Sequence, residues 1–335
     1  MTPRRSVFPL FIPHAGCSYD CVYCAQRSVT GQSAPVAPAD VSAALEALAF
    51  GVDELALYGG SFTALPRDTQ RDLLDAAAPH LAAGKIRSVR VSTRPDAVDE
   101  DVLDLLERRG VKTIELGAQS MDDGVLAKCR RGHTAADTRR AVSLIRERGG
   151  FHLILQMMTG LPGSTDALDR AAAEEIAALR PDGVRIYPAV ILRDTTLHTL
   201  WRRGEYREHT VEDAVRVCAE ILPVFEAASI PVIRLGLNPT EELSNSGAVA
   251  GGAYHPALGE LVKSRVFLKK ARALLLASKP EERESVVLGV NKSEISQMTG
   301  QHRQNLAALE SEFKLCSVRV EAAVLPRGGL VLLRK

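Results

Sequence analysis

The chain has 335 residues, 46% of them hydrophobic and 25% charged, and its 42 basic and 41 acidic side chains leave a net charge of +1. A chain of this length can bury one large core and a small second one, and it contains no apolar run of about eighteen residues, so we predict no membrane-spanning helix. Its six cysteines, three of them clustered, argue for a reducing compartment rather than a disulfide framework, and we expect a cytoplasmic protein.

The N-terminus imitates a lipoprotein signal, because two arginines and an apolar stretch precede Cys17. The apolar stretch is short and is broken by Pro9 and Pro13, and His14 stands where a small apolar residue is needed. We therefore expect no export.

Short apolar runs alternate with helical patterns along the chain, with a repeat of roughly thirty to forty residues. Strands are predicted at residues 7–12, 54–58, 88–92, 113–117, 152–157, 183–188 and 231–235. Helices are predicted between them, at residues 39–49, 69–81, 100–108, 135–148, 167–179 and 211–228. Strands separated by crossover helices pair in parallel, so the pattern predicts an α/β fold with a barrel-like parallel sheet. In such a barrel, ligands gather at the C-terminal ends of the strands.

Three cysteines, Cys17, Cys21 and Cys24, are spaced Cys-x3-Cys-x2-Cys near the start of the chain. Within eight residues the backbone can curl so that three thiolates reach three corners of an iron-sulfur cube and leave the fourth iron without a protein ligand. The same cysteines with His14 form the alternative of a Cys3His zinc site, although the ligand pairs of structural zinc sites usually lie far apart in sequence. We favour the cluster, whose open iron is a place for chemistry.

This spacing, and the phrase FIPHAGCSYDCVYCAQRSVTGQ with Tyr23 just before the third cysteine, resemble the radical S-adenosylmethionine (radical SAM) superfamily. The phrase is similar to that of the Elongator catalytic subunit and its shorter bacterial relatives. The resemblance implies a [4Fe-4S] cluster on the three cysteines, S-adenosylmethionine (SAM) on the fourth iron, and a reductant such as flavodoxin or ferredoxin. It also implies a 5′-deoxyadenosyl radical that takes a hydrogen atom from the substrate, and a partial (β/α)6 barrel related to the TIM barrel.

Motifs at the predicted strand ends resemble those that contact SAM in this family. In the loop YGGSFT, Gly59 and Gly60 let the backbone approach a ligand without obstruction by a Cβ atom. In the family this loop receives the amino group of SAM, often with an acidic residue where Ser61 stands. The third and fourth strands end in STRPD and ELGAQS, which resemble the Elongator catalytic subunit and the oxygen-independent coproporphyrinogen oxidases.

Polar side chains at the ends of buried strands need hydrogen-bonding partners, which a ribose or a carboxylate supplies. We expect Glu115 and Gln119 on the ribose side and Arg94 at an anionic group. The alternative for Arg94 is an internal ion pair with Asp96 or Glu115. The full set of expected SAM-binding residues is Tyr23, Gly59, Gly60, Ser61, Ser92, Arg94, Glu115, Gln119 and Gln156.

Five further residues are considered, and three of them have two possible roles each. In RGHT, which repeats a family signature, Thr134 is the predicted N-cap of the next helix and His133 is left open. Tyr187 either touches substrate or lies in the core with its hydroxyl bound. Cys129 is either a free thiol or a substrate-side group, and His255 either contacts substrate or holds a turn before proline.

The chain is predicted to divide into a barrel at residues 1–240, a loop or barrel-closing segment at 241–260 and a small α/β domain at 261–335. The last part carries fourteen basic against seven acidic side chains, which suggests an anionic partner. We predict a strand at 286–290, a helix at 304–313 and a closing hairpin of strands at 317–324 and 329–333.

The loop GQHRQNL before that helix is similar to the KH module, whose GxxG loop clamps a nucleic-acid backbone, although Arg303 stands in place of the second glycine. Lys292, His302 and Arg303 are therefore our candidate RNA-binding residues. A domain that only caps the barrel is the alternative.

We predict a radical SAM enzyme that acts on RNA, with a tRNA uridine as the first expectation. The alternatives are an enzyme for a porphyrinogen or another small molecule, and an iron-sulfur RNA-binding sensor without catalysis. The basic C-terminal part favours RNA over porphyrinogen, and the strand-end motifs favour catalysis because a sensor needs no nucleoside-sized pocket. The Elongator catalytic subunit continues into an acetyltransferase domain where this chain ends, so its carboxymethylation chemistry is not expected to transfer unchanged.

Overall fold

The computed structural model describes residues 6–12, 17, 19–25, 36–238, 243 and 247–334. The chain divides into two compact units, one made of residues 1–210 and 224–254 and the other of residues 211–223 and 255–335. The division falls within helix α9 (Val211–Ala227). Within the described ranges, no helix is both long and apolar enough to cross a membrane.

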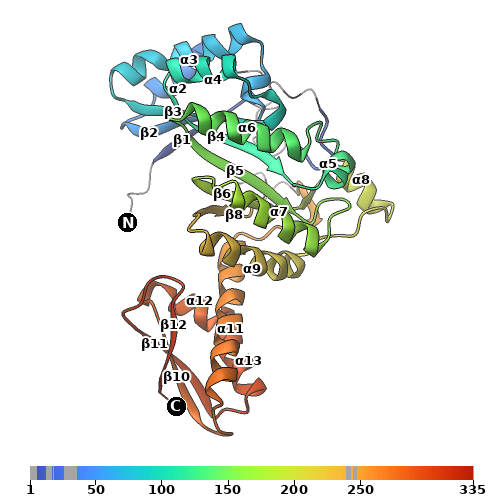
Figure 1. The fold of residues 1–335 in the computed structure, drawn as a ribbon, viewed down its shortest axis with the longest axis vertical. Coiled ribbons are helices and arrows are strands. Elements are labelled where there is room, and N and C mark those ends of the chain that lie inside the picture. The colour runs from blue at the N-terminus through green and yellow to red at the C-terminus, as the bar shows by residue number, and fades with distance from the viewer. Residues whose placement is uncertain are drawn as a thin grey trace. The chain divides into compact units, whose positions relative to one another are not determined.

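A parallel sheet of seven strands builds the first unit (Figure 1). The strands follow one another across the sheet in chain order, and every neighbouring pair is parallel. They are β1 (Val7–Phe11), β2 (Val52–Tyr58), β3 (Ile86–Thr93), β4 (Val111–Gln119), β5 (His152–Thr159), β6 (Gly183–Pro188) and β8 (Val232–Leu235). This confirms the predicted partial barrel, and each strand ends within two residues of its predicted limits.

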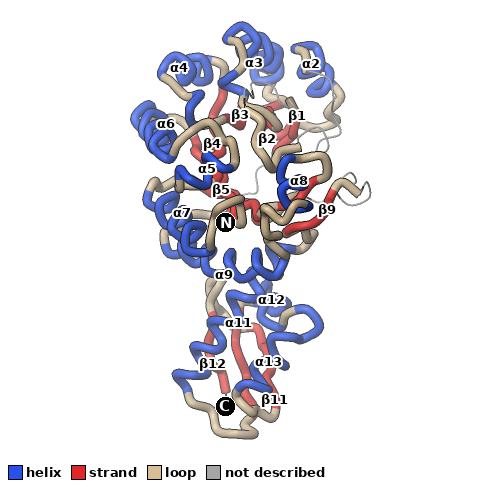
Figure 2. Tube along the Cα trace, turned by 90° about the vertical axis from the view of Figure 1, so that its right-hand side faces the viewer, coloured by secondary structure: helices blue, strands red, loops and turns tan. Residues whose placement is uncertain are grey.

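Helices cover the outer face of this sheet, and Figure 2 shows them in an arc around the strands. They are α2 (Pro38–Glu46), α3 (Arg67–Ala82), α4 (Glu100–Arg108), α6 (Ala135–Arg148) and α7 (Asp166–Ala178). Three of them begin with a side chain that accepts a hydrogen bond from a backbone amide of the first turn, namely Asp99, Thr134 and Thr165. The N-cap role predicted for Thr134 is confirmed.

The two faces of the sheet differ in polarity, because side chains alternate between them along each strand. The helix-covered face is apolar, and its fully buried side chains include Leu55, Leu57, Val89, Val91, Ile114, Leu116, Leu153 and Leu155. The inner face carries buried charged groups instead, with Glu54 on β2, Arg90 on β3 and Glu115 on β4. The polar inner face is where a site can form.

Several short elements of the first unit were not predicted. They are the helices α5 (Asp123–Lys128) and α8 (Thr196–Arg202), the 3-10 turns η1 (Phe62–Ala64) and η2 (Pro95–Ala97), and an antiparallel pair formed by β7 (Val190–Leu192) and β9 (Val249–Gly252). Segments of three to seven residues carry too little periodicity to be recognised from sequence.

The second unit packs a three-stranded sheet against helices. Its elements are α11 (Leu258–Ser278), β10 (Ser285–Val290), η3 (Lys292–Glu294), α12 (Ile295–Thr299), η4 (Gln301–Arg303), α13 (Gln304–Glu312), β11 (Ser317–Ala322) and β12 (Leu330–Arg334). Their apolar side chains form one core that includes Phe267, Leu275, Val286, Leu288, Met298 and Leu309. The predicted strands and the helix after residue 304 are confirmed.

The predicted hairpin at the C-terminus is wrong in its pairing. Strand β10 lies between the other two, parallel to β11 and antiparallel to β12. Val286, Leu288 and Val290 of β10 are completely buried, whereas β11 and β12 are partly exposed. The most apolar strand takes the centre because both of its edges are then paired, and the alternation in the sequence predicts strands without naming their neighbours.

Candidate functional site

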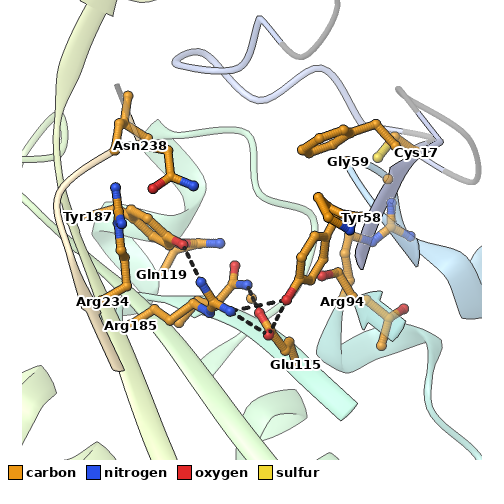
Figure 3. Close-up of a pocket in the computed structure, with 18 of the residues that line it drawn as sticks. Cys17, Tyr58, Gly59, Arg94, Glu115, Gln119, Arg185, Tyr187, Arg234 and Asn238 are labelled. Atoms are coloured by element: carbon orange, nitrogen blue, oxygen red, sulfur yellow. Dashed lines mark hydrogen bonds and ion pairs between the residues drawn. The ribbon is translucent and has the colours of Figure 1, made fainter. Parts of the chain in front are cut away.

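A cavity of about 680 Å³ opens over the C-terminal ends of the strands of the first unit (Figure 3). Each of the seven strands, or the loop that follows it, contributes to the lining. The described residues that line the cavity include four arginines and one glutamate, so this lining is strongly basic: Arg94, Arg131, Arg185, Arg234 and Glu115. Its volume lies within the range of small-molecule sites, roughly 300 to 1,000 Å³.

The three clustered cysteines lie in the segment that follows β1, and all three are half-buried thiols. Cys17 forms part of the cavity wall. Within the described ranges, no three His, Cys, Asp or Glu side chains converge as ligands of one ion. The zinc alternative would place Cys17, Cys21 and Cys24 around one ion. His14, the fourth ligand of that alternative, lies outside the described residues.

The middle of this cysteine loop is held by peptide groups on both sides. The Val22 amide donates to the Cys129 carbonyl at 3.2 Å, and the Val22 carbonyl accepts from the Leu197 amide at 2.7 Å. The Cys24 amide donates to the Cys21 carbonyl at 3.0 Å and closes a turn. The ends of α5 and α8, neither of which was predicted, thus fix the loop between the second and third cysteines.

Arg131 is a site residue that sequence reasoning missed. Its Nη1 lies 3.5 Å from the Cys21 sulfur, and its Nη2 donates to the Gly117 carbonyl at 2.7 Å. Burial acts to lower the pKa of Arg131, but the Tyr23 hydroxyl and the Cys21 sulfur outweigh it and raise that pKa. A permanent positive charge therefore lies beside the cysteine loop. The RGHT motif was the available signal for it.

Arg94 forms one of the internal ion pairs foreseen as alternatives to a ligand contact. Its Nε lies 3.0 Å from Asp96 Oδ1, and its guanidinium carbon lies 4.7 Å from the centroid of the Tyr19 ring. Arg94 still lines the cavity. Burial raises the pKa of the Cys17 thiol, and the nearby charge of Arg94 acts against that rise.

A buried ion-pair network forms the floor of the cavity. Arg90 bridges two carboxylates, since its Nε donates to Glu54 at 3.0 Å and its Nη1 donates to Glu115 at 2.6 Å. Arg185 donates to the same oxygen of Glu115 at 3.0 Å. Burial alone would raise the pKa of Glu115, but Arg185 and Arg90 outweigh it and hold that pKa below its ordinary value. Glu115 is therefore ionised at neutral pH.

Glu115 also receives two neutral donors. The Tyr58 hydroxyl donates to its Oε1 at 2.8 Å, and Gln156 Nε2 donates to its Oε2 at 2.7 Å. Figure 3 shows Tyr58 and Arg185 reaching Glu115 from different strands. Glu115 thus anchors the polar side chains of the cavity floor, and its oxygens are engaged within the protein.

Gln119 differs from Glu115, because its side-chain oxygen has no partner among the described residues. It ends β4 in a left-handed backbone conformation with φ 65°, and the pairing of β4 with β5 shifts register just before it. Its Oε1 is buried without a hydrogen-bond partner among the described residues. Such a backbone costs about 1 to 3 kcal/mol, and an unpaired buried oxygen costs about as much again. Gln119 is therefore poised to accept a hydrogen bond from a ligand.

Seven of the nine expected SAM-binding residues line the cavity, namely Gly59, Gly60, Ser92, Arg94, Glu115, Gln119 and Gln156. Tyr23 and Ser61 do not. Tyr23 packs against an apolar cluster that contains Val22 and Leu161, and its hydroxyl is buried without a described partner. The Ser61 hydroxyl lies 3.0 Å from that of Thr93 and supports the strand ends from beneath.

Two other candidates, His133 and His255, have hydrogen-bond partners within the protein, and a third, Cys129, is buried. His133 is buried with Nε2 3.2 Å from the Ala118 carbonyl, and burial, aided by Arg131, lowers its pKa to about 4. Burial raises the pKa of Cys129 to about 12. His255 Nδ1 accepts from a backbone amide two residues on, at 3.1 Å, which is the turn role.

The expected RNA-binding residues lie in the second unit and are all exposed. Lys292 begins η3, while His302 and Arg303 stand between α12 and α13 with φ 47° and φ 62°. Arg303 therefore adopts the left-handed backbone that favours glycine, at the position where a GxxG loop has its second glycine.

Residues 11–174 match the family model of the radical SAM superfamily, and residues 181–267 match that of the radical SAM C-terminal domain. The chain belongs to the radical SAM superfamily. The two matched segments contain the cysteine loop and all strands of the radical SAM sheet from β2 onward.

Curated relatives match the radical SAM region. The tRNA uridine(34) acetyltransferase of Methanocaldococcus jannaschii is 34% identical over 130 residues, which are 38% of this chain and 24% of the relative. Elongator complex protein 3 of Homo sapiens is 31% identical over 202 residues, or 53% of this chain and 36% of the relative. The chain thus spans about a quarter to a third of the length of these relatives.

Solved structures share the fold. The Elp3 protein of Methanocaldococcus infernus, solved with an N-terminal deletion, superimposes with a TM-score of 0.59 at 22% identity, covering 84% of this chain and 66% of that one. The coproporphyrinogen III oxidase HemN of Escherichia coli, a radical SAM enzyme, gives a TM-score of 0.52 at 17% identity, covering 68% and 54%. Both likenesses support the partial barrel.

Proposed function

We propose that this protein binds a [4Fe-4S] cluster through Cys17, Cys21 and Cys24, cleaves SAM reductively, and modifies a base in RNA, with a tRNA uridine as the first candidate. The observation that carries the proposal is the position of the cysteine loop at one end of a basic, nucleoside-sized cavity, with Cys17 in its wall.

The residues present suit both cofactors. The three thiols are half-buried and Cys17 lines the cavity, so they are open to a cluster in which each thiolate holds a separate iron. Arg131 places a positive charge beside the Cys21 sulfur, where a negatively charged cluster ligand would lie. Gly59 has φ +90°, a conformation that L side chains rarely adopt, so bare backbone faces the cavity there.

When bound, the cluster would supply the electron that splits SAM into methionine and a 5′-deoxyadenosyl radical. The chain's own residues would orient the reactants. Gly59 and Gly60 would let backbone groups meet the methionine end, and the unpaired oxygen of Gln119 would accept a hydrogen bond from a ribose hydroxyl. Glu115, held ionised by its arginines, would keep Tyr58 directed at the cavity.

Two observations support RNA as the substrate. The radical SAM region is homologous to that of proteins named for modification of tRNA uridine 34. The second unit carries exposed cations, including Lys292 and Arg303, which pair with no carboxylate among the described residues. Basic surfaces of this kind bind phosphate backbones. The proposal covers the radical step alone and includes no acetyl transfer.

The test begins with protein prepared and reconstituted under anaerobic conditions. Iron and sulfide content, the absorbance of the cluster, and release of 5′-deoxyadenosine after reduction are measured. Changing Cys17, Cys21 or Cys24 singly to Ala should abolish 5′-deoxyadenosine release, whereas Cys316→Ala, at an exposed thiol of the second unit, should leave it unchanged. Nucleoside mass spectrometry of tRNA incubated with the enzyme then identifies the product.

Full SAM cleavage by any of the three single cysteine variants, or zinc in place of iron after anaerobic preparation, would refute the cluster assignment. Unaltered tRNA, together with SAM cleavage stimulated by a porphyrinogen or another small molecule, would refute the RNA substrate and leave the radical chemistry in place.

A further inference from the structure

The end of the cavity that lies farthest from the cysteine loop is built by the last two strands of the sheet. Cys17 follows β1 at one edge of the sheet, whereas Arg185 and Tyr187 belong to β6 and Arg234 belongs to β8 at the other edge. Figure 3 shows Cys17 and Arg234 on opposite sides of the cavity. A ligand that reaches Arg234 is therefore remote from the cluster.

Arg185 and Arg234 are direct register partners across β6 and β8. Neighbouring strands lie about 4.8 Å apart, so the two side chains leave the sheet side by side on the same face. Both line the cavity. Like charges directly opposite each other on paired strands repel, so this arrangement is unfavourable unless a negative group lies between or above them.

Glu115 supplies the negative group for Arg185 but not for Arg234. Arg185 donates to Glu115 and to the Tyr58 hydroxyl, each at 3.0 Å, and its Nη1 lies 3.5 Å from the Tyr187 hydroxyl. Its Nε is nevertheless buried without a partner among the described residues.

Within the part of the chain that the structure describes, no carboxylate pairs with Arg234. Its one hydrogen bond there runs from Nε to the carbonyl of Gly236, at 3.0 Å. Burial lowers the pKa of Arg234, and the charge of Arg185 adds to this effect. An arginine stays charged even so, and its terminal Nη groups can bind both oxygens of an oxyanion.

We propose that Arg234 and Arg185 form a receptor for an oxyanion carried by the substrate, and that this group is the phosphate next to the modified base. The assignment of this oxyanion as a phosphate rests on the RNA substrate proposed above. The assignment of an oxyanion receptor rests on the two arginines. The methionine carboxylate of SAM is the competing anion. SAM bound to a cluster on the three cysteines would have its methionine at the Cys17 end, which would leave the arginine pair to the substrate.

The test measures binding to the cluster-loaded protein under anaerobic conditions with saturating SAM. The probes are uridine 5′-monophosphate, uridine, inorganic phosphate and succinate. The binding of each is measured by calorimetry. The variants are Arg234→Gln and Arg234→Lys, which keeps the charge. Arg87→Gln is the matched control, because Arg87 lies on a strand of the same sheet with its side chain 81% exposed.

We expect the wild-type protein to bind uridine monophosphate at least tenfold more tightly than uridine, with an advantage that shrinks as salt rises. Arg234→Gln should abolish that advantage, Arg234→Lys should retain part of it, and Arg87→Gln should retain all of it. The affinity for SAM should change less than twofold in all three variants.

Equal binding of the nucleotide and the nucleoside by the wild-type protein, or a phosphate advantage that survives in Arg234→Gln while tRNA is modified, overturns the inference and leaves the proposed function standing. A tenfold loss of SAM affinity in Arg234→Gln, with phosphate competing against SAM, overturns it as well, since the arginine then holds the cofactor. Succinate binding that depends on Arg234, without nucleotide binding, supports the receptor and removes RNA as the substrate.

Discussion

The charge network on the inner face of the sheet makes a sharp prediction about stability. Arg90 is 7% exposed and lies between Glu54 and Glu115, whose side chains are 1% and 0% exposed. Arg90→Met keeps much of the volume but removes the only cation that contacts both carboxylates among the described residues. The hydroxyl groups of Thr113 and Ser88 still donate to Oε1 of Glu54, but neither carries a positive charge.

The expected loss of folding stability is large because the ion pair is buried. Removing one partner of a buried ion pair costs about 3 to 5 kcal/mol, because the remaining charge is left without compensation. For a unit of this size, each kcal/mol shifts the melting temperature by about 2 to 4 °C, so Arg90→Met should lower it by about 6 to 20 °C. Thermal unfolding followed by circular dichroism measures this, and Arg87→Met, on the exposed side of the same strand, is the control, with an expected change below about 0.5 kcal/mol.

The loss of stability caused by Arg90→Met should depend on pH. Because Arg185 and Arg90 hold the pKa of Glu115 below its ordinary value, the stability contributed by ionised Glu115 is complete above the unfolded carboxyl pKa of about 4.3 and is lost as pH falls through the folded value. The difference between the wild-type protein and Arg90→Met should therefore be constant at neutral pH and shrink below about pH 4. A melting temperature that falls by less than about 2 °C, or a difference that grows in acid, would contradict the reasoning.

Three further changes test other parts of the molecule. Gln119→Ala removes the unpaired buried oxygen and should weaken SAM binding by about 1 to 3 kcal/mol without loss of iron; unchanged SAM affinity in calorimetry would remove Gln119 from the site. Asn305→Ala should destabilise the second unit by about 1 to 3 kcal/mol in thermal unfolding, because the buried Asn305 amide bonds α11 and α12 backbone carbonyls; an unaltered melting curve would speak against this. Changing Lys292 and Arg303 together to Gln should weaken tRNA binding and make the tRNA affinity depend less on salt concentration, while SAM cleavage persists. An unchanged salt dependence would mean that other residues contact the RNA phosphates.

The sequence predicts the radical SAM sheet well because its strands are long apolar runs separated by capped helices. Each predicted strand ends within two residues of the observed one. The pairing in the second unit could not be obtained in this way, since alternation identifies β11 and β12 as strands but contains no information about the strand that separates them.

Some residues of the candidate site could be predicted from the sequence, and others were missed for physical reasons. Residues at strand ends, such as Gln119 and Gln156, reach the cavity because parallel strands end at one edge of the sheet. Arg90 and Arg185 lie within strands, where an isolated charge in the sequence does not reveal that register brings it against Glu115. Arg234 lies on the last strand, far along the chain, and its pairing with Arg185 depends on the register alone.

The backbone of Val22 is tied to Cys129 and Leu197 through peptide groups, which form the same hydrogen bonds whether or not iron is present. The turn between Cys21 and Cys24 therefore keeps its position in the folded apoprotein, with thiols that remain half open to solvent. Assembly of the proposed cluster would then follow folding instead of accompanying it. Loss of that cluster to oxygen, and its later repair, would be local events at the rim of an intact sheet.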